Sequence, residues 1–133
     1  MKYVLMMHSA GKSWDEDGLG SWPPEAMEAH LAFLRAFNAA LVESGELVQI
    51  VALVSPEEMR MVRAKTGGGA TITDGPYPES KEFLAGFWMI DVESLDRALE
   101  LAAQASAGPG PDGKPLNMPI QVRAVMGGPG QEM

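Results

Sequence analysis

The 133-residue chain has no cysteine and few basic residues, and each shortage excludes a class of protein. Without cysteine there is no disulfide, no thiolate metal site and no cysteine nucleophile. Lysine and arginine number 10 against 18 aspartate and glutamate residues, which gives a formal net charge of −8. A chain with this charge repels a phosphate backbone and an anionic lipid surface. We therefore expect neither a nucleic acid nor a membrane as its partner.

Long apolar runs and the common catalytic motifs are also missing. The opening MKYVLMMHSAG has an apolar run of only about five residues, which is shorter than a signal peptide requires. No stretch approaches the roughly 20 apolar residues that cross a bilayer, so a cytoplasmic protein is expected. There is no G-x-S-x-G, H-E-x-x-H or dinucleotide-binding pattern, and the glycines 67–69 precede no Lys-Ser/Thr. No cofactor is expected.

The residues that are present fit one folded domain. Apolar residues make up 46% of the chain, and 133 residues are too few for two domains with adequate cores. We expect a single domain over residues 1–126. The last segment, GGPGQEM at 127–133, is expected to be a flexible tail.

Hydrophobic periodicity predicts two helices and several strands. Residues 25–43 repeat apolar side chains every three or four positions, and Gly45 follows as a stop signal. Ser94 is a good N-cap for a second helix through Ala105, with Leu95, Ala98, Leu99 and Ala102 on its inner face. The predicted strands are 2–8, 46–54, 59–65, 70–73, 84–92 and 120–126, and the glycines 67–69 form a hairpin turn.

Two helices are too few to cover both faces of such a sheet. They would shield one face and leave the other, with its valine, methionine and phenylalanine side chains, open to water. A second copy stacked against that face is the simplest cover, so a symmetric homodimer is expected.

The segment TDGPYPESKEFLAGFW, residues 73–88, is the most informative motif. It resembles the signature of the DGPF/YCII-related family, and the following IDVESLDRALELAA is similar to the family's strand and second helix. KYVLMMH and IQVRAVM are similar to its first and last strands. The resemblance implies an α+β, ferredoxin-like domain with a mainly antiparallel sheet and two helices on one face. It also implies pairing into a dimeric α+β barrel.

His30 and Asp74 are the candidate catalytic residues. His30 resembles the helix histidine of YCII-type proteins, for which a His and an Asp near a cleft at the sheet edge are proposed to act. A half-buried neutral imidazole can exchange a proton near pH 7, and Asp74 could orient it. The structural alternatives are a histidine at the core edge bonded to a backbone carbonyl, and an aspartate that stabilises its own turn.

Five further residues are candidates for ligand binding: Tyr77, Lys81, Glu82, His8 and Trp22. Tyr77 stands where the family usually has Phe, and Lys81 and Glu82 equally suit a solvated ion-pair face. Trp14 and Trp22 lie in a loop that either closes over a pocket or covers a partner subunit. The two histidines and Asp74 have no recognisable ligand spacing, so no metal is expected.

Two functions remain open from the sequence. One is a small-molecule pocket, enzyme-like, in which His30 and Asp74 perform acid–base chemistry of a lyase or hydrolytic type. The other is a non-catalytic ligand-binding or regulatory dimer linked to transcription through a protein partner, since other family members look associated with sigma-factor regulation. Residues 49–52 read QIVA where many relatives carry a Gly-Glu-Gly run, and this loss of a carboxylate favours the second function.

Overall fold

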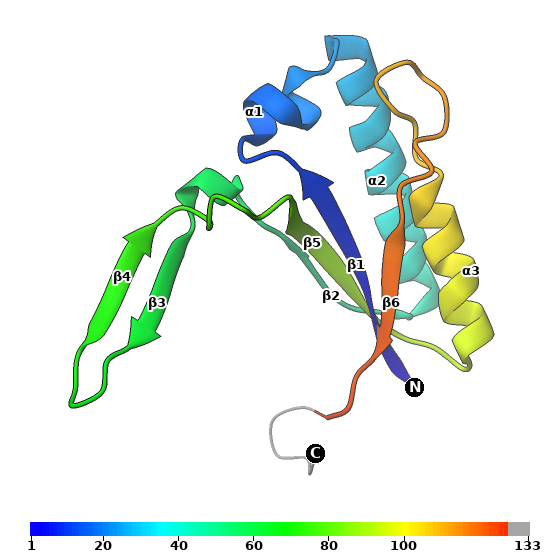
Figure 1. Cartoon of the computed structure of the whole chain (residues 1–133). Coiled ribbons are helices and arrows are strands. Elements are labelled where there is room, and N and C mark those ends of the chain that lie inside the picture. Colours follow the sequence, from blue (N-terminus) through cyan, green and yellow to red (C-terminus); the bar gives the residue numbers. More distant parts are fainter. Residues whose placement is uncertain (128–133) are drawn as a thin grey trace.

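The computed structural model describes residues 1–127 and consists of one four-stranded antiparallel sheet, two long helices and a separate hairpin (Figure 1). The sheet order is β2-β5-β1-β6, and this order in a β-α-β repeat is the ferredoxin-like arrangement. The α+β class and the antiparallel sheet are confirmed. In chain order the elements are β1 (Lys2–Ala10), α1 (Trp14–Asp17), η1 (Leu19–Ser21), α2 (Pro24–Ser44), β2 (Leu47–Ala52), η2 (Pro56–Glu58), β3 (Arg60–Ala64), β4 (Ala70–Asp74), β5 (Glu82–Asp91), α3 (Leu95–Ser106) and β6 (Ile120–Ala124).

The two long helices begin and end where the sequence signals indicate. Pro24 opens α2, where its missing N–H costs no hydrogen bond, and Gly45 closes it in the left-handed conformation with φ of 78°. The Ser94 hydroxyl accepts a hydrogen bond from the Arg97 N–H at 3.1 Å and caps α3. These terminal signals are local, which is why the sequence alone located them.

The predicted inner face of α3 was half wrong. Ala98 and Ala102 are buried, but Leu95 and Leu99 are exposed, and the remaining buried positions are Leu101 and Ala105. The face that packs on the sheet is therefore built mainly from alanines. Small side chains on the packed face permit close contact between a helix and a sheet.

The core lies between the sheet and the two helices. Tyr3 and Leu5 of β1 stand opposite Ile90 and Trp88 of β5 on the helix-covered face. The Trp88 ring meets Phe37 of α2 edge to face, with centroids 5.3 Å apart. Its indole N–H donates to the Asn38 side-chain oxygen at 2.7 Å, so this nearly fully buried ring leaves no polar atom unpaired.

The opposite face of the sheet carries half-exposed apolar side chains and no helix. Val4 stands opposite Met89, and Met6 and Val51 stand on either side of Phe87. Both long helices lie on the other side of the sheet in Figure 1. Within this single chain, helices cover one face of the sheet and leave the other open, as the sequence predicts. We call the surface formed by these five residues the open sheet face.

An ion pair joins the start of β2 to α3 at the edge of the core. Arg97 donates to both carboxylate oxygens of Glu46, at 2.9 Å each, and to Glu100 at 2.8 Å. The Arg97 guanidinium hydrogen-bonded to Glu46 holds the pKa of that carboxyl below its usual value, and the Ser44 hydroxyl adds to this effect.

The predicted hairpin is present, but it stands apart from the main sheet. β3 and β4 pair with each other across a turn containing Gly67, Gly68 and Gly69, all with positive φ. Figure 1 shows this hairpin reaching away from the helices. We call residues 60–74 the arm.

Two further expectations concern the C-terminal tail and the absence of a membrane-spanning segment. Apart from Gly127, the expected flexible tail at 127–133 lies outside the described residues. Within residues 1–127, no helix combines the length and apolar character that a membrane span requires.

Candidate functional site

A cavity of about 600 Å³ lies at one end of the sheet, between α2, the ends of three strands and the segment that carries α1. The end of β1 contributes Met7 to Ala10, and α2 contributes Met27, His30 and Leu34. Ala85 belongs to a bulge in β5, because Met7 pairs with Gly86 while His8 pairs with Leu84. The bulge breaks the strand alternation at the cavity wall, and bulges often re-aim residues beside sites.

The segment between β1 and α2 forms the outer wall of the cavity. Ser13 caps α1 by accepting from the Glu16 N–H at 3.3 Å. The Trp14 indole donates to the Leu53 carbonyl at 3.0 Å, and the Trp14 N–H donates to the buried Ser55 hydroxyl at 2.9 Å. These bonds fasten the segment to the end of β2. Trp14 and Trp22 both line the cavity.

His30 is the buried titratable group of this cavity, with 9% of its surface exposed. Its Nδ1 lies 2.9 Å from the carbonyl oxygen of Pro109. Because a carbonyl oxygen only accepts hydrogen bonds, Nδ1 carries the proton, and Nε2 of the neutral ring is an acceptor. The Trp22 ring packs edge to face against the imidazole, with centroids 5.2 Å apart. The ring is thus fixed in orientation and tautomer, while Nε2 makes no hydrogen bond within residues 1–127.

The connector between α3 and β6 supplies the carbonyl that holds His30. Residues 108–116 fold back on themselves through the Leu116 N–H to Gly108 carbonyl bond at 2.7 Å. A side chain at Gly108 would lie 2.9 Å from the Phe33 ring, so glycine permits the connector to approach α2. Leu116 and Met118 then complete the cavity wall. The sequence offered no signal for this role, since a backbone carbonyl has no residue signature.

The charge of the cavity wall is one-sided. Among the described residues that line it there is no lysine or arginine, and the exposed Asp17 is its one acidic residue. Apolar and aromatic side chains make up most of the remainder. Asp17 was not among the residues singled out from the sequence, because WDED reads as an ordinary acidic loop. This composition favours a ligand without negative charge.

The structure brings three of the predicted site residues together. His30, His8 and Trp22 line the same cavity. Asp74 does not line it: it lies at the end of β4, its side chain is 85% exposed, and it pairs with Arg60 at 3.0 Å. Within one chain, the partner of the His30 ring is the Pro109 carbonyl and not the Asp74 carboxylate.

The other predicted ligand-binding residues lie around the arm. Tyr77 lines a shallow recess of about 320 Å³ with Met61, Arg63 and Thr73 of the arm. Lys81 and Glu82 are exposed at the start of β5 and do not line the cavity of His30. Within residues 1–127, no three histidine, aspartate or glutamate side chains gather as a metal would require.

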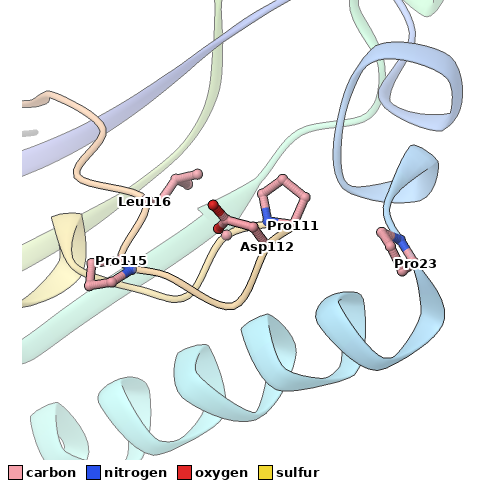
Figure 2. Close-up of a pocket in the computed structure, with 6 residues that line it drawn as sticks. Pro23, Pro111, Asp112, Pro115 and Leu116 are labelled. Carbon is pink, nitrogen blue, oxygen red and sulfur yellow. The ribbon is translucent and has the colours of Figure 1, made fainter.

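A second recess, of about 440 Å³, lies between the connector and the start of α2 (Figure 2). Pro111, Asp112 and Pro115 come from the connector, and Pro23 lies across from them. Asp112 accepts from the Lys114 N–H at 3.0 Å and so serves the turn. This recess is lined by prolines and has no histidine among its described residues, which makes the larger cavity at His30 the better candidate site.

Comparison with known proteins places this architecture in a family. A family model described as the YCII-related domain matches residues 1–109. An uncharacterized protein of Rhizobium meliloti (strain 1021) is 36% identical over 106 residues, which cover 80% of this chain and 81% of that protein. The match includes β1, α2 and the arm but stops at Pro109, so Leu116 and Met118 of the cavity wall lie beyond it. The chain belongs to the family of proteins with a YCII-related domain.

Proposed function

We propose that the cavity at His30 binds a small, mainly apolar molecule that carries no negative charge. The observation that supports this most directly is a space of about 600 Å³ with aromatic and aliphatic walls, the imidazoles of His30 and His8, and no lysine or arginine in its described lining. A carboxylate or phosphate ligand would find Asp17 and no lysine or arginine among the described lining residues, an unfavourable balance of charge that a neutral or cationic ligand avoids.

The proposed role of His30 is to accept a hydrogen bond or a proton from that molecule through Nε2. The Pro109 carbonyl fixes Nδ1 as the protonated nitrogen, so the free lone pair belongs to Nε2. A reaction of the lyase or hydrolytic type would use this nitrogen as a general base. Asp74, tied to Arg60 on the arm, has no part in this step of the proposal.

Thermal shift and tryptophan fluorescence test the binding proposal with three matched sets of probes. Neutral, cationic and anionic aromatic molecules of similar size are compared on the full chain. We expect stabilisation by members of the first two sets, and a ligand at 100 times its Kd would add about 2.7 kcal/mol. Equal or stronger binding of the anionic set would contradict the proposed ligand class, and no binding by any set would contradict the site itself.

Three substitutions at His30 separate its structural role from its chemical role. The amide of His30→Asn can still donate to the Pro109 carbonyl but lacks an acceptor at the Nε2 position. The longer His30→Gln side chain has an acceptor at the Nε2 position but lacks the donor to Pro109. We expect His30→Asn to keep near-native stability and lose ligand binding, and His30→Ala to lose both. If His30→Asn binds the probes as the parent chain does, Nε2 plays no part in recognition.

We further propose that a second copy covers the open sheet face, giving a homodimer. Five half-exposed apolar side chains on one sheet surface, with no helix over them, support this arrangement. The regulatory alternative, a non-catalytic dimer acting through a protein partner, requires the same pairing of two copies through this face. Phe87 lies at the centre of this face. If sedimentation velocity shows that the Phe87→Asp variant is a monomer, the result supports both the homodimer and the regulatory dimer. An unchanged oligomeric state opposes both.

A further inference from the structure

The arm is an unusual structure because nearly all of its residues are exposed. Residues of β4 are all exposed, and Met61 is the one half-buried residue of β3. Val62 stands opposite Ile72 in the middle of the hairpin, and each is 65% exposed. A two-stranded hairpin is at best marginally stable in water without a surface to pack against. This segment therefore needs a cover that its own chain does not supply.

The two faces of the arm differ in character. The strand register puts Val62, Ile72, Ala64 and Ala70 on one face, where the Arg60–Asp74 pair neutralises the only charges. Arg63 lies on the other face beside Thr71, with Tyr77 and Met61 nearby. The arm thus combines an apolar strip with cationic side chains at its far end.

The charge of the arm is opposite to that of the remainder of the chain. The arm holds three of the ten lysine and arginine residues and one of the eighteen acidic residues, so it carries +2 and the remainder carries −10. Arg63 and Lys65 form no ion pair within residues 1–127. Acidic residues crowd the end of the sheet from which the arm departs, with Asp15 and Glu16 on α1 and Glu57 and Glu58 on η2. A basic arm on an acidic body is complementary to another copy of the same chain.

We propose that the arm clasps a second copy of this chain by packing the Val62 and Ile72 strip against the body of its partner. Arg63, on the opposite face of the arm, and Lys65 attract the acidic partner through their charge without joining the apolar contact. Figure 1 shows the arm reaching to the side away from the helices, which is the side of the open sheet face. A copy seated on that face would lie within reach of the arm. The inference rests on the dimer proposed above and adds the contact that would make it tight.

Sedimentation velocity of the full chain over a range of concentrations tests the clasp. The double variant Val62→Asp/Ile72→Asp changes two side chains that are exposed in the monomer, so far-UV circular dichroism should remain native. Val42→Asp/Leu99→Asp is the matched control, since these residues are 64% and 47% exposed on the helices. We expect the arm variant to raise the dimer Kd at least about tenfold, as loss of a central apolar contact does, and the control to leave it unchanged.

The outcomes separate the clasp from the dimer itself. A dimer of unchanged Kd in the arm variant would overturn the clasp and leave the open sheet face as the interface. A parent chain that stays monomeric throughout would overturn both. Because the chain has no cysteine, Ile72→Cys gives a single attachment point for a benzophenone photocrosslinker. A covalent dimer from Ile72→Cys but not from Leu99→Cys supports the clasp, and the same yield from both opposes it.

Discussion

Gly86 of β5 lies against the backbone of β2, and a single methyl group there should be destabilising. A Cβ built on Gly86 would lie 2.5 Å from the Val51 carbonyl oxygen and 3.3 Å from the Ala52 Cα. Both neighbours are backbone atoms, so no side chain can rotate to relieve the contact. β2 must instead move away from β5, against the bond from the Leu53 N–H to the Ala85 carbonyl at 2.9 Å.

The magnitude for Gly86→Ala follows from two opposing effects. Crowding of a packed site costs about 1–3 kcal/mol. Replacing glycine reduces the entropy of the unfolded chain, which returns about 0.4–1 kcal/mol. We expect a net loss of about 1–2 kcal/mol in the free energy of unfolding, since the steric term is the larger. Gly86 stands opposite Met7 and Ala52, which both line the cavity, so ligand binding should weaken as well.

Urea unfolding followed by tryptophan fluorescence measures this change directly. Gly45→Ala is the comparison, because its Cβ would meet nothing within 4 Å and the cost there comes only from the left-handed backbone. Without the contact to Val51, Gly86→Ala would stabilise the protein by lowering the entropy of the unfolded chain. A steric clash therefore predicts a loss of stability, whereas the entropy effect alone predicts a gain. A Gly86→Ala variant at least as stable as the parent would refute the steric reasoning.

Two further predictions concern buried polar contacts. Asn38→Ala should lower the free energy of unfolding by about 1–3 kcal/mol, because the buried Trp88 N–H loses its acceptor; urea titration should find a smaller cost in a Trp88→Phe background, where no donor remains. The Glu46 carboxyl has a lowered pKa in the folded state, so its contribution is present above its unfolded pKa and is lost as the pH falls through the folded value. Glu46→Gln should therefore lower the free energy of unfolding by about 1 kcal/mol at pH 7, and the difference from the parent should become smaller as the pH falls. A difference that is constant between neutral and acid pH would contradict this.

His30 shows most clearly which features of the site the sequence predicts and which only the structure reveals. The helical stripe of residues 25–43 identified this histidine, since spacing along one helix is a local property. Its hydrogen-bond partner is a carbonyl 79 residues away on the connector, and backbone carbonyls are the same in every residue. The sequence suggested Asp74 for that role, but Asp74 lies on the arm beside Arg60. The distance between two segments in space depends on how the whole chain packs.

The remaining differences have the same cause. The four-residue helix α1 was missed because it is held by Trp14 bonds to Leu53 and Ser55 and not by its own periodicity. The packed face of α3 depended on how the helix lies on the sheet, and its own sequence pattern did not fix that. By itself the sequence determined the two long helices, the order and approximate bounds of the strands, the hairpin turn and the one-sided cover of the sheet, because capping, turn and periodicity preferences act over a few residues. Only the tertiary structure decided which walls meet around His30 and that the arm stands free, because those depend on long-range packing that no local pattern encodes.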